Sequence, residues 1–86
     1  MPEISRFFGI VIRMFHNDHA PPHFHVQYGN EYAAMTVANG ELLFGSLSPR
    51  VVRLVREWAT LHEAELLEDW HLAQAHEALK PIEPLR

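Results

Sequence analysis

The chain has 86 residues, of which 48% are hydrophobic and 21% charged, and its formal net charge is −4. This length suits one small domain, and the apolar fraction excludes a disordered tail. The absence of cysteine excludes disulfides and thiolate metal sites, and the acidic balance argues against a general nucleic-acid-binding protein, which is usually basic.

No segment has the pattern of a membrane span. The apolar run over residues 7–12 ends at Arg13 and is far shorter than the ~20 residues that a helix needs to cross a bilayer. The first residues, MPEISR, lack the basic leader and the cleavage site of a secretory signal. We therefore expect a cytoplasmic protein without a membrane partner.

The first half of the chain, about residues 7–45, has the pattern of β-strands. In residues 23–28, Phe24 and Val26 alternate with His23 and His25, which places the two imidazoles on one face of a strand. Gly-Asn and Asn-Gly pairs predict tight turns, and strands that are joined so tightly are antiparallel. The expected strands span residues 7–16, 23–28, 31–38 and 41–45.

The second half has the pattern of two helices, at about residues 49–60 and 62–78. Ser48 is a good N-cap and Pro49 suits the first helical position. Thr60 and Glu63 have the spacing of a capping box, which predicts a kink or tight turn near residues 60–62. Pro81 stops the helix, so residues 79–86 are expected to lie extended over the domain.

These patterns predict a two-layer α+β fold for a single domain, residues 1–86. An antiparallel meander of three to four strands is covered on one face by two C-terminal helices. So small a core is marginally stable, and a homodimer or another partner would stabilise it. The expected core consists of Ile10, Ile12, Phe24, Val26, Val51, Leu54, Val55, Trp58, Leu66 and Trp70.

Four of the seven histidines lie in residues 16–25, around a double proline. Three interpretations are open. The side chains are ordinary polar groups on an exposed sheet face, or His19, His23 and His25 bind a transition-metal ion such as zinc. The third is acid–base catalysis by His23 and His25, with Asp18 or a backbone carbonyl fixing the tautomer.

Acid–base chemistry of this kind is used by metal-independent ribonucleases, which also need cations to stabilise the phosphorane. Arg13, Arg50 and Arg53 are the candidate cations, and Arg13 is expected on the face of the first strand opposite Ile12. The net charge counts against RNA as a partner. Arg50 and Arg53 otherwise form a solvated helix flank, or bind phosphate or an acidic partner.

Several segments together resemble the bacterial domain-of-unknown-function family 4160. They are ISRFFGI at residues 4–10, Asp18-His19, PPHFH at residues 21–25, ELL at residues 65–67 followed by Trp70, and PIEPL at residues 81–85. The resemblance implies a small bacterial or phage-borne protein, commonly encoded beside a second small protein of unknown function. It implies no catalytic activity.

The family pattern centres on the block from Asp18 to His25, and the resemblance therefore points to Asp18, His19, Pro21 and Pro22 as binding residues beside His23 and His25. His16 stands where the family more often has an aromatic residue, so a site that needs His16 is not expected.

We expect a protein-interaction component of a two-gene, toxin–antitoxin-like module, without a cofactor, whose partner is encoded by the neighbouring gene. The partner would cover a sheet edge or the histidine face. The alternatives are a small metal-independent ribonuclease-like toxin and a metal-responsive regulator.

Overall fold

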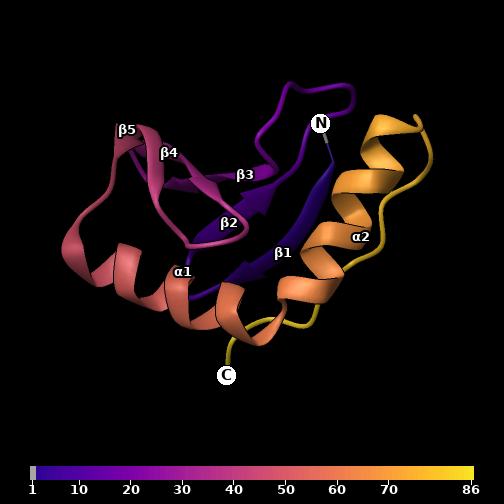
Figure 1. Ribbon diagram of the computed structural model, residues 1–86. Helices are drawn as coiled ribbons and strands as arrows, with labels where there is room; N and C mark the ends of the chain where they lie inside the picture. Colours follow the sequence, from indigo (N-terminus) through magenta and orange to yellow (C-terminus); the bar gives the residue numbers. More distant parts are fainter. Residues whose placement is uncertain (1) are drawn as a thin grey trace.

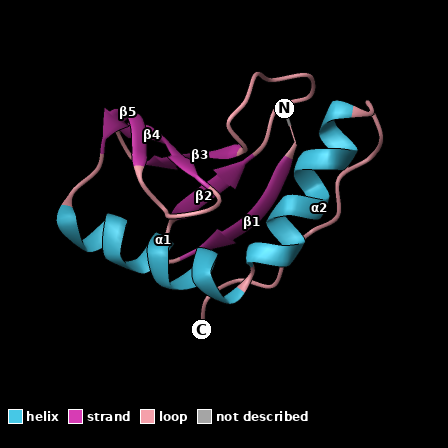
Figure 2. Cartoon of the chain, in the orientation of Figure 1, coloured by secondary structure: helices cyan, strands magenta, loops and turns pink. Residues whose placement is uncertain are grey.

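The computed structural model describes residues 2–86 and contains a sheet followed by two helices (Figures 1 and 2). Five antiparallel strands lie in the order β1-β2-β3-β4-β5, so the sheet is an uninterrupted meander. The predicted α+β class is confirmed, with one strand more than expected. The elements are β1 (Glu3–Phe7), β2 (Ile10–Arg13), β3 (His23–Tyr28), β4 (Glu31–Thr36), β5 (Leu42–Ser46), α1 (Pro49–Leu61) and α2 (Glu63–Gln74).

The additional strand comes from the start of the chain, where one strand over residues 7–16 was predicted. β1 ends at Phe7, and a tight turn through Phe8 and Gly9, with φ values of 51° and 80°, leads into β2. Gly9 adopts a positive φ easily, whereas a phenylalanine in the left-handed region is uncommon. Because Phe8 is not a typical turn residue, the sequence pattern did not reveal the turn between β1 and β2.

The two helices meet at His62, within the predicted turn. The predicted capping box does not form, because the Thr60 hydroxyl donates a hydrogen bond to the Arg56 carbonyl of the preceding turn. α2 ends at Gln74, four residues before the predicted end, since His76 takes a φ of 59° and the chain reverses there. The Glu77 N–H then bonds to the Leu72 carbonyl, which satisfies one of the last carbonyls of the helix.

Both helices pack against one face of the sheet and bury its apolar side chains. Phe24 contacts Trp58 of α1 edge to face, with ring centroids 5.9 Å apart. Leu54 is half-buried at the margin of this core instead of lying inside it, whereas the other nine expected core residues are buried. The core of the sheet and helices includes Ile10, Ile12, Phe24, Val26, Met35, Val51, Val55, Trp58 and Leu66.

Residues 79–86 have no regular secondary structure and close the β1 side of the domain. The Ile82 N–H donates to the Ile4 carbonyl at 2.8 Å, and the Trp58 indole N–H donates to the Glu83 carbonyl at 2.8 Å. Ile82 and Leu85 are buried in the core. Between residues 2 and 86, neither helix has the length and apolar character needed to span a bilayer.

Candidate metal centre

The loop between β2 and β3, residues 14–22, projects from one end of the sheet beside α2 (Figure 1). Its position is fixed by the C-terminal turn of that helix. The Asn17 N–H donates to the Ala73 carbonyl at 3.2 Å, and the Gln74 side-chain amide donates to the Asp18 carbonyl at 2.7 Å. The backbone that carries Asp18 is therefore held in place by hydrogen bonds to residues more than fifty positions later in the chain.

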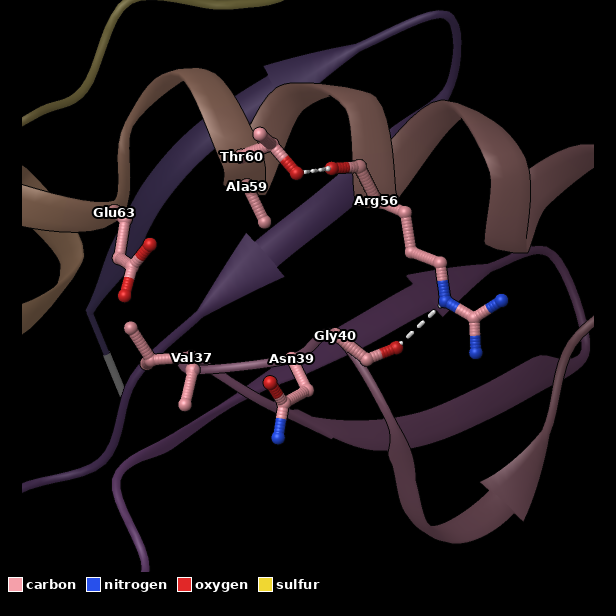
Figure 3. A pocket seen from close by; sticks show the side chains of 8 residues that line it. Val37, Asn39, Gly40, Arg56, Ala59, Thr60 and Glu63 are labelled. Atoms are coloured by element: carbon pink, nitrogen blue, oxygen red, sulfur yellow. Dashed lines mark hydrogen bonds between the residues drawn. The ribbon is translucent and has the colours of Figure 1, made fainter.

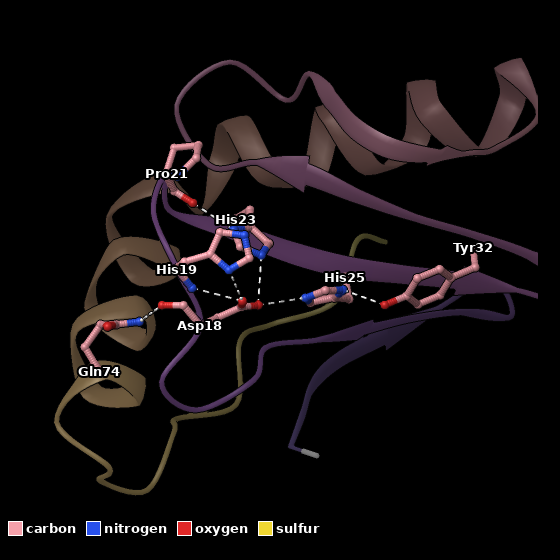
Figure 4. A network of polar contacts seen from close by, with 7 residues as sticks. All are labelled: Asp18, His19, Pro21, His23, His25, Tyr32 and Gln74. Carbon is pink, nitrogen blue, oxygen red and sulfur yellow. Dashed lines mark hydrogen bonds and ion pairs between the residues drawn. The ribbon is translucent and has the colours of Figure 1, made fainter.

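The Asp18 carboxylate lies between the imidazoles of His23 and His25 (Figure 4). Its Oδ2 atom is 2.9 Å from His23 Nε2 and 3.2 Å from His25 Nε2. The two rings project from the same face of β3, as the period of a strand requires, and their centroids are 5.2 Å apart. Three potential ligand atoms thus converge on one small volume.

The tautomer of His23 follows from its other ring nitrogen. Nδ1 is 2.7 Å from the Pro21 carbonyl oxygen, which can only accept, so Nδ1 carries a proton. A neutral His23 therefore directs the lone pair of Nε2 at the Asp18 carboxylate. Two hydrogen-bond acceptors, Nε2 and Oδ2, would then face each other at 2.9 Å with no proton between them, which is unfavourable. A cation must lie between them, either a second proton on His23 or a metal ion.

His25 is enclosed by aromatic side chains. Its ring stacks on Phe15 with centroids 4.0 Å apart, and Nδ1 is 2.6 Å from the Tyr32 hydroxyl. Burial is the main cause that lowers the pKa of His25 and favours the neutral ring, although the Asp18 carboxylate acts in the opposite direction. At neutral pH His25 is therefore in the form that binds metals.

Asp18 is ionised at neutral pH, which is the form in which a carboxylate binds metals. Partial burial acts to raise its pKa, but the hydrogen bonds from His25 and the His19 backbone N–H and the nearby His23 together lower it below the ordinary value. Ligand atoms bound to one transition-metal ion at about 2.0–2.2 Å lie roughly 3 Å apart, close to the distances of Asp18 Oδ2 from the two Nε2 atoms, and one ligand atom from each of the three residues lies within 4.8 Å of the others. One carboxylate and two imidazoles form a donor set that suits zinc and non-haem iron.

The surroundings of both imidazoles also match a metal site. Histidine ligands usually donate the second ring N–H to a carbonyl, carboxylate or other acceptor, which fixes the ring and its tautomer. The Pro21 carbonyl has this role for His23, and the Tyr32 oxygen can have it for His25. Both rings are buried, so the interpretation of His23 and His25 as exposed polar groups is wrong.

His19, one of the three predicted metal ligands, lies outside this group. Its side chain is 92% exposed, and its Nδ1 is 3.2 Å from Oδ1 of Asp18, the oxygen that faces away from the two buried imidazoles. Asp18 occupies the place in the ligand set that sequence analysis gave to its neighbour. His16 is also outside the set, because its Nε2 bonds to the Glu77 carbonyl.

The remaining predicted residues are dispersed. Arg13 lies opposite His25 in the sheet register, but its guanidinium donates to the Gln27 side chain at 2.7 Å. The Pro22 carbonyl accepts a hydrogen bond from the Val37 N–H, which holds the end of the loop against the turn after β4. Arg50 and Arg53 are exposed on α1, away from the histidines.

Sequence analysis missed Tyr32, Phe15 and Gln74. A signal for Tyr32 was present, because the Gly29-Asn30 turn sets the β3–β4 register and places Tyr32 opposite Gln27, diagonal to His25. Phe15 stacks on His25 from the start of the loop, after β2 has ended; the predicted strand over residues 7–16 put it on the same face as Arg13, but sequence analysis gave it no role. Gln74 is distant in sequence and had no such signal.

A pocket of about 120 Å³ lies elsewhere, between α1 and the turn after β4 (Figure 3). Arg56 lines it, but the guanidinium donates to the Gly40 carbonyl at 2.8 Å and is thereby occupied. None of the predicted site residues reaches this pocket. Among the described residues, the cluster of potential metal-ligating side chains is Asp18, His23 and His25.

The fold and the site belong to a small α+β domain with a histidine–carboxylate cluster. The family model described as a domain of unknown function (DUF4160) matches residues 9–71, and the chain belongs to this family. The match includes the whole cluster and the loop that carries it. Neither a curated protein nor a solved structure shows significant similarity to the chain.

Proposed function

We propose that this protein is a metal-binding module in which Asp18, His23 and His25 bind one divalent transition-metal ion, with zinc as the first candidate. The observation that carries the proposal is the orientation of His23. Its Nδ1 proton is committed to the Pro21 carbonyl, so Nε2 presents a lone pair towards Asp18. A metal ion satisfies that lone pair, the carboxylate and His25 together.

Three protein ligands leave at least one coordination position open for water or a small ligand. A closed structural zinc site has four protein ligands, so the donor set favours a responsive or catalytic metal over a purely structural one. Exposed His19 lies next to the site on the Asp18 side and is the candidate for a fourth ligand. Of the three functions considered from sequence, the metal-responsive regulator agrees best with this geometry.

The ribonuclease-like alternative is less well supported. Acid–base catalysis needs imidazoles that reach a substrate, whereas His23 and His25 are buried and the Nδ1 atom of each is held by a neighbouring oxygen. Of the candidate cations, Arg13 is bonded to Gln27, and Arg50 and Arg53 belong to α1. A role in a two-gene, toxin–antitoxin-like module stays a prediction of sequence analysis, as does a cytoplasmic location.

The test is isothermal titration of chelator-treated, tag-free protein with Zn²⁺, followed by elemental analysis after dialysis. We expect one ion per chain in the wild type. Asp18→Asn keeps the shape of the side chain but removes its charge, and it should weaken binding by at least about tenfold. Co²⁺ substitution gives a second measurement, because the visible spectrum reports the number and type of ligands.

Two matched variants serve as controls. His71→Gln removes an exposed histidine on α2 and should leave the zinc affinity unchanged. His19→Ala distinguishes a three-ligand site, in which affinity is kept, from a site in which His19 is recruited. A wild-type protein that binds no metal under these conditions, or that binds it equally well as Asp18→Asn, would contradict the proposal.

A further inference from the structure

The second feature of interest is the edge strand β5. All five of its residues are exposed, and three of them are large and apolar: Leu42, Leu43 and Phe44 are 42%, 41% and 51% exposed. Tyr32 on the neighbouring strand is 41% exposed, and its ring centroid lies 6.3 Å from that of Phe44. We call these four residues the apolar strip.

The strip lies at the free edge of the sheet. The opposite edge, β1, is closed by the C-terminal residues through the bond from the Ile82 N–H to the Ile4 carbonyl. β5 has a neighbour on one side only, and it contains no charged residue and no proline, two of the devices that usually protect an edge from association. An exposed apolar patch at such an edge is typical of a surface that binds a partner.

The register of β5 limits what can bind there. Phe44 pairs with Ala34 and Leu42 with Met35, so Leu43 is an extra residue between them. Gly45 has a φ of 82°, which bends the strand further. Such irregularities twist an edge away from long, flat pairing. A short extended segment therefore fits the strip better than a full strand of another sheet.

Two free cations follow the strip in the chain. Arg50 and Arg53 are exposed, and within residues 2–86 neither forms an ion pair or a side-chain hydrogen bond, whereas Arg6, Lys80 and Arg86 each pair with a glutamate. Arg50 follows Ser46 by four residues, so its Cα lies within about 14 Å of the end of β5. At the start of α1 the Ser48 N–H donates to the Glu31 carboxylate at 2.7 Å, so the helix N-terminus already faces a negative charge and the attraction for an acidic segment depends on the two arginines.

We propose that the apolar strip, with Arg50 and Arg53, binds a short, extended, acidic and apolar segment of a partner protein. Apolar side chains of that segment cover Phe44 and Tyr32, which share one face of the sheet, and its carboxylates approach the two arginines. A second copy of this chain is the competing occupant, and the oligomeric state measured below distinguishes it. This surface adjoins the proposed metal site, because the Tyr32 hydroxyl is 2.6 Å from His25 Nδ1 and the Phe44 ring centroid is 6.1 Å from that of His25.

The experiment uses a fluorescein-labelled peptide of alternating glutamate and leucine, valine or phenylalanine, and a twin in which lysine replaces every glutamate. Fluorescence anisotropy with the full chain should show that the acidic peptide binds at least about tenfold more tightly than the lysine twin, by an amount that falls as salt is added. Phe44→Ser, and separately the double change Arg50→Glu with Arg53→Glu, should each weaken binding at least about fivefold.

The control variants keep the same chemistry at other places. Leu61→Ser removes an apolar side chain that is 66% exposed at the end of α1, and Arg86→Glu reverses a charge near the C-terminus. Both should bind like the wild type. Leu43→Ser is a second strip variant in case Phe44→Ser unfolds, and circular dichroism checks the fold of each.

Absence of binding by the acidic peptide overturns the proposal, and so does equal binding of the two peptides. Tighter binding of a short oligouridine would assign the surface to single-stranded nucleic acid instead. A concentration-dependent dimer in light scattering that Phe44→Ser abolishes would assign it to a second copy. Each of these outcomes excludes the acidic segment as the occupant.

Discussion

Zinc should stabilise the native protein strongly, because the proposed ligands converge only after β3 and the loop before it have folded. An ion that binds only the native state adds about 2.7 kcal/mol when its free concentration is 100-fold above its dissociation constant. For a domain of this length, each kcal/mol shifts the melting temperature by about 4–8 °C. We therefore expect zinc to raise the melting temperature by about 10–20 °C, measured by circular dichroism on chelator-treated protein.

Asp18→Asn separates the metal from the rest of the network. Without zinc, this variant loses the carboxylate that faces both imidazoles, and we expect it to be about 1–3 kcal/mol less stable than the wild type. With zinc at the same concentration, it should gain at most about 1.4 kcal/mol, half of the wild-type gain, if its affinity is tenfold lower. The response should weaken as pH falls, since protons compete with the metal for the histidines and the carboxylate.

His19→Ala is the control for stability, because that side chain is 92% exposed and contacts Asp18 only from solvent. It should melt at the wild-type temperature without zinc. An equal zinc response in the wild type and in Asp18→Asn would refute the reasoning, since nonspecific binding to surface histidines gives that result. A wild type with no response would refute it as well.

Three further predictions concern the scaffold. Gly45→Ala should cost about 3 kcal/mol in urea unfolding, because the new Cβ would lie 2.2 Å from the Tyr32 carbonyl oxygen at a φ of 82°. Ile82→Ala should cost about 2–4 kcal/mol by the same assay, since it empties a buried position and loosens the C-terminal residues. Burial raises the pKa of Asp69, so the wild type should lose stability as pH rises through the folded-state pKa of that carboxyl. Asp69→Asn should remove this pH-dependent contribution. Unfolding free energies of the wild type and the variant that change identically from about pH 4 to 7 would contradict this prediction.

The layers of the fold could be predicted because their signals are local. The alternation of Phe24 and Val26 with His23 and His25 fixes which side chains face the helices, and the Gly29-Asn30 turn fixes the pairing of β3 with β4. The β1–β2 hairpin could not be predicted in this way, because Phe8 occupies a positive-φ position with a side chain that normally avoids it. The end of α2 was missed for the same reason at His76.

Some residues of the candidate site could be predicted from local sequence, and others are placed by contacts with distant parts of the chain. His23 and His25 belong to a strand, so their common face follows from its period alone. Asp18 and His19 are adjacent in a loop, where sequence has no period to say which side chain points inward. The structure places Asp18 inward because Ala73 and Gln74, at the end of α2, bond to the backbone of Asn17 and Asp18. The proposed ligand set therefore depends on how the second half of the chain packs on the first, and a variant such as Gln74→Ala should weaken the proposed metal binding without changing a proposed ligand.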